Sequence, residues 1–155
     1  MSGDPKPNAK VLFRIRNEDG GEFTETLWAI SMDGDLYELA NSPFFAYGVS
    51  WQDVVFAPLD PREGMPTFQS VVTRSGNRTV RIRFELPLGQ GHASDALLQG
   101  LTELGCDYEG ANRHYISLNI PKEVNLQDVR SYLIANAMEW EHADPTYQTL
   151  FPDEP

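Results

Sequence analysis

Cysteine is almost absent from this chain, and positive charge is scarce. Cys106 is the single cysteine among 155 residues, which excludes an intramolecular disulfide and a thiolate metal cage within one chain. Twelve basic side chains stand against 23 acidic ones, giving a formal net charge of −11. This excess repels nucleic-acid phosphates and anionic membranes and favours encounter with basic surfaces. The composition predicts a cytoplasmic protein with a basic protein partner, although acidic residues also serve solubility alone.

Long apolar runs and catalytic motifs are lacking as well. No segment approaches the roughly 20 apolar residues that a membrane span requires, and the first eight residues contain no signal-peptide core. The three histidines are scattered without metal-ligand spacing, and no phosphate-binding glycine motif is present. We therefore expect no metal, no cofactor, no nucleic acid, no membrane contact and no catalytic residue. Cys106 could act as a nucleophile with His114 or His142 as its base, but its position after a helix end favours a buried, inert thiol, so we do not expect a thiol enzyme.

Short strands dominate the first half of the chain. Val11, Phe13 and Ile15 alternate with polar residues, as in a half-buried strand. Turn residues rich in Gly and Asp separate this segment from further strands at 23–30 and 36–39. Two more strands are expected at 53–57 and 68–73, on either side of a proline-rich segment. Five short strands in this space predict a small β-barrel-like unit over residues 10–76.

The second half alternates strands with helices. A strand over 79–86 precedes a helix that begins near Ser94 and Asp95 and ends before Gly105. A hairpin of strands at 106–109 and 115–120 follows, then a helix capped by Asn125, then a strand at 140–143. The order strand, helix, strand, strand, helix, strand predicts a ferredoxin-like βαββαβ sandwich.

The sequence thus predicts an α+β protein whose barrel-like half packs on its ferredoxin-like half. We place a flexible tail at 1–9, the barrel-like unit at 10–76, the ferredoxin-like unit at 77–147 and an acidic, proline-containing tail at 148–155. The segment between the two units is too short for a flexible linker, so the units should be in contact.

Four motifs resemble those of a bacterial family catalogued as domain of unknown function 4265. They are Leu27-Trp-Ala, Asn41-x-Pro-Phe-Phe-Ala-Tyr-Gly-Val-Ser-x-x-Asp-Val-Val55, Ser75-Gly-Asn-Arg-Thr-Val80 and Leu104-Gly-Cys-x-Tyr-Glu-Gly110. The resemblance extends over about residues 10–148 and implies no activity. Small acidic proteins of such families often accompany secreted toxins as their immunity partners, which is an analogy that favours the same role here.

Aromatic and acidic residues form the candidate partner-binding set. The aromatic residues between Pro43 and Trp51 are too closely spaced to face one core, so some should be exposed for recognition, unless the loop only joins the two halves. The segment 139–147 adds acids and aromatics suited to a basic cleft, although it could equally complete the sheet. The candidate residues are Phe44, Phe45, Tyr47, Trp51, Trp140, Glu141, Asp144 and Tyr147.

Arginines offer a second candidate site. Arg78, Arg81 and Arg83 could bind an anion between the halves, whereas pairing with Glu22, Glu25 and Glu85 across strands is the plainer role. The leading hypothesis is therefore a non-catalytic inhibitor, of the immunity or antitoxin type, that occludes a basic effector such as a cognate toxin. A small-molecule anion sensor that uses the three arginines is the alternative, and an enzyme is the third possibility.

Overall fold

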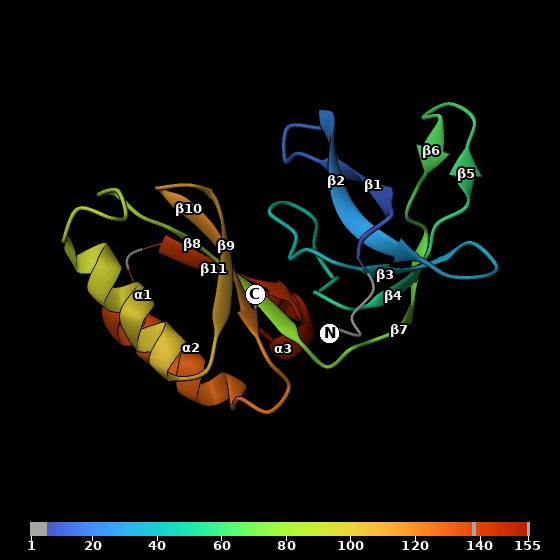
Figure 1. The fold of residues 1–155 in the computed structure, drawn as a ribbon. Helices are drawn as coiled ribbons and strands as arrows, with labels where there is room; N and C mark the ends of the chain where they lie inside the picture. The colour runs from blue at the N-terminus through green and yellow to red at the C-terminus, as the bar shows by residue number, and fades with distance from the viewer. Residues whose placement is uncertain (1–5, 138, 155) are drawn as a thin grey trace.

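Two antiparallel sheets and two long helices make up a mixed, sheet-rich α+β fold (Figure 1). The structure is a computed structural model, and it describes residues 6–137 and 139–154. Both helices lie on the side of the second sheet that faces away from the first sheet (Figure 1). The opposite face of the second sheet is therefore turned toward the first half of the chain.

The first sheet contains five strands in the order β1-β2-β3-β4-β7. The strands are β1 (Ala9–Arg16), β2 (Glu22–Ser31), β3 (Leu36–Leu39), β4 (Val54–Phe56) and β7 (Ser70–Thr73). The alternation expected for β1 is present only in part: Val11 and Phe13 are buried and Arg14 is exposed, but Leu12 is buried as well. The side chains of Val11 and Phe13 join Leu27, Leu39 and other apolar residues in one core.

The predicted barrel does not close. Strands β1 and β7 lie at opposite edges of the sheet, and only one isolated bridge, between Leu12 and Thr67, connects β1 to the segment before β7. Prolines leave this segment short of backbone donors, and it forms a two-stranded hairpin of its own, β5 (Leu59–Asp60) and β6 (Met65–Pro66). The result is an open five-stranded sheet with a small appended hairpin.

The second sheet has the strand order β11-β8-β10-β9, with every neighbouring pair antiparallel. Its strands are β8 (Arg78–Arg83), β9 (Asp107–Asn112), β10 (Tyr115–Ile120) and β11 (Glu139–Asp144), and the helices are α1 (Ala93–Glu103) and α2 (Leu126–Asn136). Val80, Ile82 and Leu118 point toward the helices and pack on Leu101 and Leu133. The other face carries mostly polar residues.

The helix ends differ in how well local sequence predicts them. Asn125 caps α2 as expected, because its side-chain oxygen accepts the N–H groups of Gln127 and Asp128. Gly105, with φ of +107°, follows α1 as expected, and the N–H of Cys106 returns to the carbonyl of Leu101 in a Schellman arrangement.

The expected cap at the start of α1 is wrong. His92 occupies the cap position without a side-chain hydrogen bond. The Ser94 hydroxyl donates instead to the carbonyl of Leu86, while the Asp95 carboxylate accepts the N–H groups of Gly89 and Gly91. These backbone N–H groups lower the pKa of Asp95.

The C-terminal segment is not merely a tail. Tyr147–Leu150 form a short helix, α3, which Thr146 caps. The Phe151 ring then packs on Tyr147 and lies 4.6 Å from the Arg130 guanidinium. The predicted N-terminal tail falls largely outside the described residues. Within the described residues, no helix is sufficiently long and apolar to span a membrane.

Candidate binding cleft between the two sheets

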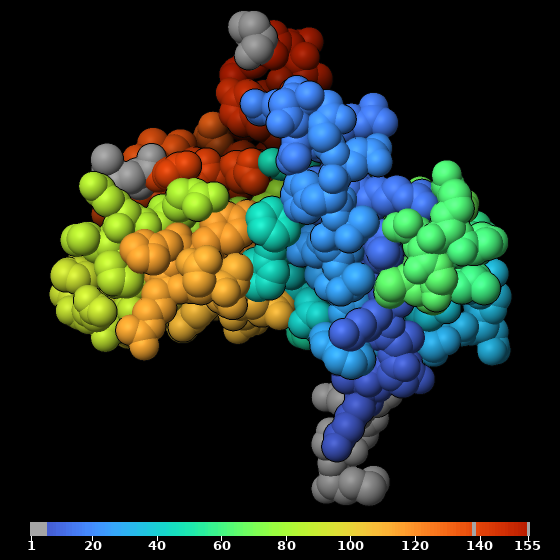
Figure 2. Space-filling model, turned by 90° about the horizontal axis from the view of Figure 1, so that it is seen from above, coloured from blue at the N-terminus to red at the C-terminus, as the bar shows by residue number. Residues whose placement is uncertain are grey.

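The loop of residues 40–53 lies between the two sheets. Figure 2 shows this part of the chain, in teal, wedged between the blue strands of the first sheet and the orange strands of the second. The loop has no regular secondary structure apart from turns, so its backbone groups need partners elsewhere. Side chains from both sheets supply them.

A buried carboxylate on the first sheet holds the aromatic part of the loop. Glu25 shares the inward face of β2 with Leu27, where an apolar residue would be expected. Its oxygens accept the N–H groups of Phe44, Phe45 and Ala46, at 2.6, 3.2 and 2.9 Å. Hydrogen bonds to an ionised acceptor are stronger than neutral ones, so Glu25 fixes the backbone that carries the two phenylalanines.

Strands β9 and β10 hold the same loop from the other side. The hydroxyls of Ser117 and Tyr115 donate to the carbonyls of Pro43 and Phe44, at 2.7 and 2.5 Å. The Glu109 carboxylate accepts from the Asn41 amide and from the backbone N–H of Ser42. The loop is thus fixed by hydrogen bonds to both sheets.

The far end of the loop is anchored to the last strand. The Ser50 hydroxyl donates to Asp144 at 2.6 Å and lies 2.7 Å from the Thr79 hydroxyl. Arg74 donates to the same carboxylate at 3.3 Å. Burial raises the pKa of Asp144, although these hydrogen bonds act in the opposite direction.

Arg81 lies at the centre of the contact between the loop and the second sheet. Its side chain is only 1% exposed, and its guanidinium donates to the Ala46 carbonyl at 2.8 Å and to Glu141 at 3.1 Å. The Tyr47 ring lies 4.5 Å from the same guanidinium, and the Tyr47 hydroxyl donates to Glu141 at 2.8 Å. Burial and the Glu141 carboxylate raise the pKa of Tyr47, which keeps that hydroxyl protonated as a donor.

An open cleft adjoins this cluster, and we call it the aromatic cleft. Its volume is about 330 Å³, and it lies between the β1–β2 hairpin, the loop and the polar face of the second sheet. The Phe45 ring meets Phe23 edge-on at 5.3 Å and stacks on Tyr115 at 5.9 Å. The lining includes Ile15, Phe23, Phe45, Tyr47, Arg81, Tyr115 and Glu141. A smaller hollow next to it shares Arg81, Tyr115 and Glu141 and adds Arg83 and Glu139.

Four of the eight predicted partner-binding residues line the aromatic cleft. Phe45, Tyr47 and Glu141 come together at the aromatic cleft, with 44% of Phe45 and 53% of Tyr47 exposed. Phe44 also lines the cleft but is half-buried.

The remaining members lie elsewhere. Trp51 is half-buried at the opposite end of the loop, and Asp144 is buried beneath Ser50. Trp140 packs with the helix-side core and also lines the smaller hollow next to the aromatic cleft, and Tyr147 is exposed on α3. Asp144 is therefore an internal anchor, because its carboxylate is occupied by Ser50 and Arg74. Sequence reasoning missed Phe23 and Tyr115, whose spacing matched ordinary strand residues.

The three arginines of the predicted anion site do not converge. Arg78 has the strand parity of Val80 and Ile82, and its guanidinium donates to the backbone carbonyls of Ile120, Pro121 and Val124. Arg81 is engaged by the Ala46 carbonyl and by Glu141. Arg83 lies 3.6 Å from Glu139 and stacks over Tyr115. Cross-strand pairing with glutamates, the plainer role considered for these side chains, applies to Arg81 and Arg83, but their partners are Glu141 and Glu139 and not Glu22, Glu25 or Glu85.

The arrangement of Cys106 and His114 does not suit a thiol–imidazole pair. The register of β9 and β10, each six residues long, places Cys106 and His114 at opposite ends of the hairpin that the two strands form. Cys106 is buried, and burial raises the pKa of its thiol to about 11. His114 contacts the carbonyl of Phe84 through Nδ1 at 2.9 Å. In the described part of the chain, no group of three or more potential ligands could hold a metal ion.

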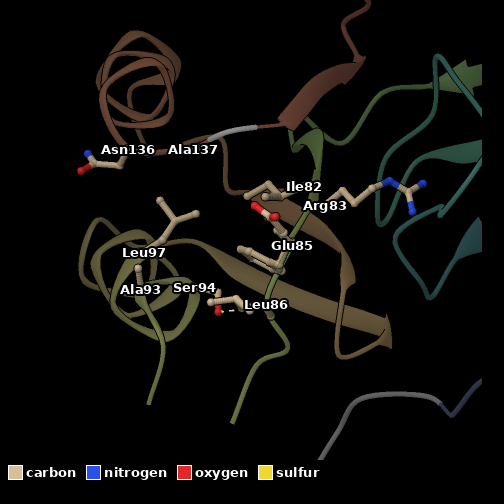
Figure 3. A pocket seen from close by; sticks show the side chains of 10 residues that line it. Ile82, Arg83, Glu85, Leu86, Ala93, Ser94, Leu97, Asn136 and Ala137 are labelled. Atoms are coloured by element: carbon tan, nitrogen blue, oxygen red, sulfur yellow. Dashed lines mark hydrogen bonds between the residues drawn. The ribbon is translucent and has the colours of Figure 1, made fainter. Parts of the chain in front are cut away.

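A further hollow lies at the end of the helical layer (Figure 3). Its volume is about 170 Å³, and Leu86, Leu97 and Ala137 are among the residues that line it. Figure 3 shows the Arg83 side chain pointing away from it, toward the first sheet. The Ser94 hydroxyl in its lining donates to the carbonyl of Leu86 at 3.2 Å, so it is not paired with the Glu85 carboxylate.

Comparisons with known proteins agree on the family and the fold. A family model described as "Domain of unknown function (DUF4265)" matches residues 25–143, a narrower range than the motifs suggested. No curated protein matches the chain. The fold is similar to that in "Novel crystal structure of a hypothetical protein from Neisseria gonorrhoeae", with a TM-score of 0.76 and 19% identity. The match covers 93% of this chain and 99% of that chain. At this identity the likeness concerns the fold alone.

Proposed function

Since the chain belongs to the DUF4265 family, which brings no established activity with it, we propose its function from the aromatic cleft. The protein is a non-catalytic binding protein, of the immunity or antitoxin type, that occludes a basic effector such as a cognate toxin. The aromatic cleft is the surface that it presents to this partner. The observation that carries the proposal is the exposure of Phe45 and Tyr47 on a backbone fixed by Glu25.

Rigid, exposed aromatic rings are suited to protein recognition. Phe and Tyr bury a large area on binding and lose little rotamer entropy, because they have only two side-chain torsions. The hydrogen bonds from Glu25 order this part of the loop before a partner arrives, which lowers the entropic cost of association. Phe45 and Tyr47 are therefore the expected anchors.

The net charge of the molecule supports a basic partner. The lining of the cleft itself is balanced, because Glu18 and Glu141 stand beside Arg16 and Arg81, and Glu139 next to the cleft pairs with Arg83. With a formal net charge of −11, the whole molecule attracts cationic proteins over a distance of about one Debye length, roughly 8–10 Å at physiological salt. Long-range attraction followed by burial of aromatic rings is an ordinary mode of inhibitor binding.

The proposal includes a ferredoxin-like sandwich for the second half of the chain. The element order β8-α1-β9-β10-α2-β11 and the strand order β11-β8-β10-β9 support it. The open sheet of the first half then serves as a separate unit that docks on the helix-free face. In this view the boundary lies near residue 76, and the cleft is built where the two units meet.

The experiment is a binding measurement with the products of the genes on either side of this one, and the proposal expects one of these products to be a basic protein that binds. Association rates are measured by biolayer interferometry between about 50 and 500 mM salt, a range over which screening weakens electrostatic steering severalfold. We expect the rate to fall steeply as salt rises. Phe45→Ala and Tyr47→Ala should each weaken the affinity by about tenfold or more, as anchor truncations do.

Trp28→Ala is the matched control. Trp28 is also a large exposed aromatic residue, at 47%, but it lies on β2 and does not line the cleft. Its removal should leave affinity within about twofold of the parent protein. Equal losses for Trp28→Ala and Tyr47→Ala, or turnover of a substrate that disappears with one polar substitution, would contradict the proposal.

A further inference from the structure

A separate pocket lies at the other end of the loop, away from the aromatic cleft. Its volume is about 280 Å³. Strands β9 and β10 form its floor, and the loop forms its wall. The lining residues are Ala40, Ser42, Trp51, Asp107, Tyr108, Glu109 and Asn119. None of the residues placed in the aromatic cleft is among them.

Asn119 has unmet hydrogen-bonding capacity in the floor of this pocket. It is 3% exposed, and neither its side-chain oxygen nor its side-chain nitrogen has a hydrogen-bond partner among the described residues. Either orientation of the amide leaves two N–H donors and one acceptor oxygen unmatched. Asn119 has the strand parity of Ser117, whose hydroxyl reaches the loop, so it faces the loop and the pocket. A buried amide without partners is unfavourable unless something else binds it.

The neighbouring charges are both negative. Asp107 is the direct cross-strand neighbour of Asn119, and Glu109 is two residues further along the same face. The hydrogen bonds that Glu109 accepts come from neutral groups, the Asn41 amide and the Ser42 N–H, so its charge is not neutralised. No lysine or arginine occurs among the residues that line the pocket in the described part of the chain.

The remaining lining residues restrict the size and type of occupant. Trp51 adds an aromatic group that attracts cations, whereas the register places Tyr108 toward the opposite face of β9, at the rim. A volume of about 280 Å³ is at the small end for ligand sites.

We propose that this pocket binds a compact organic cation. Its ammonium or guanidinium group lies between Asp107 and Glu109 and donates to the Asn119 oxygen, while an acceptor on the same molecule receives the Asn119 N–H. The geometry that carries this is the unpartnered Asn119 amide beside two uncompensated carboxylates. The site is independent of the proposed partner surface.

The test uses two defined probes, Nα-acetyl-argininamide and Nα-acetyl-lysinamide, with Nα-acetyl-citrullinamide as the uncharged counterpart of the first. Binding is followed by calorimetry and by amide NMR shifts of residues 107–109 and 119. At least one cationic probe should bind saturably with a Kd of about 1 mM or lower, and the citrulline compound should bind about tenfold more weakly.

Three variants locate the binding. Asn119→Leu removes both unmatched groups at similar size, and Asp107→Asn removes one charge from an exposed side chain. Each should weaken probe binding by about tenfold. Glu123→Gln, which removes one charge from an exposed residue outside the pocket, should change it by less than about twofold.

Several results would overturn the proposal. Absence of saturable binding by both cationic probes would mean that an internal water satisfies Asn119 and that the pocket is structural. If Asp107→Asn and Glu123→Gln weakened probe binding equally, the binding would be a general electrostatic attraction to the acidic surface and not a property of the pocket. Because Asp107 is exposed, its variant remains informative if Asn119→Leu does not fold.

Discussion

At the scale of single residues, two arginines of one strand have different roles. Arg81 and Arg83 lie on the same face of β8, and each faces a glutamate of β11. Arg81 is buried and also binds the loop carbonyl of Ala46, whereas the Arg83 side chain is 57% exposed. The loop covers the first position and leaves the second open to solvent. Only Arg81 should therefore matter strongly for stability.

We expect Arg81→Met to lower the free energy of unfolding by about 2–4 kcal/mol, because it leaves the Ala46 carbonyl unpaired and removes the charge that Glu141 faces. Arg83→Met is the matched control and should cost less than about 1 kcal/mol, as exposed ion pairs do. Urea unfolding followed by far-UV circular dichroism measures both values. Similar losses for the two variants would contradict the assigned role of Arg81.

The thiol of Cys106 gives a second prediction at this scale. With a pKa of about 11, about one thiol in a thousand is ionised at pH 8. Labelling by a thiol reagent at pH 8 should therefore be at least about 100-fold slower in buffer than in concentrated urea. Rapid labelling of the native protein at one equivalent per chain would show that Cys106 is accessible and reactive.

At the scale of elements, the loop between the sheets is ordered without secondary structure. Its backbone donors and acceptors are matched by side chains of Glu25, Glu109, Tyr115 and Ser117. Gly48 adopts a φ of +79° and donates its N–H to the carbonyl of Ala143. A segment held in this way depends on individual side chains more than a helix or strand does.

Glu25→Gln should loosen this loop. An amide cannot accept three N–H groups as a carboxylate does, since one of its two heavy atoms is a donor. We expect the free energy of unfolding to fall by about 1.5–3 kcal/mol and hydrogen exchange at residues 44–46 to become faster. Glu22→Gln, at an exposed position of the same strand, should leave exchange there unchanged. Unaltered protection of 44–46 in Glu25→Gln would refute the anchoring role.

Local sequence predicted those elements whose signals are local. The Asn125 cap and the Gly105 end depend on neighbouring residues, and both are present. The cap near Ser94 failed because Asp95 binds the preceding glycine turn instead. Helix α3 has four residues, too few for a periodic pattern, and β5 and β6 have two residues each among prolines.

The candidate site was less predictable than the fold. The crowding of aromatics in the loop predicted that at least one of them would be exposed, but not that Phe45 and Tyr47 would be the exposed ones. The burial of Asp144 and Arg81 was not, because it depends on which face of a strand the distant loop covers. Alternation shows which residues share a face, but not what lies against that face. For the same reason the sequence does not show that Arg78 and Arg81 bind different parts of the protein. This depends on which segments pack against each face of β8.

At the scale of the whole molecule, the contact between the sheets is largely polar. Each sheet has its own apolar core, while ion pairs and hydrogen bonds from Glu25, Arg81 and Asp144 join the two through the loop. Many of these groups are buried, so separating the sheets would leave the loop without its partners. We infer that neither half unfolds independently.

This predicts a single unfolding transition. Leu39→Ala in the first core and Leu133→Ala in the second should each cost about 2–5 kcal/mol, as cavity-forming substitutions do. Both should shift one calorimetric peak whose van't Hoff and calorimetric enthalpies agree. Two resolved peaks, with each variant moving only one of them, would show that the halves unfold separately.

The anchors of the loop have a consequence for synthesis of the chain. Tyr47 and Ser50 bond to Glu141 and Asp144, both 94 residues further along. While the ribosome is still translating the segment between them, the loop emerges without these partners, and Phe45 and Tyr47 are open to chaperones in the nascent chain. The order of translation thus makes the loop of residues 40–53 one of the last parts of the protein to become fixed.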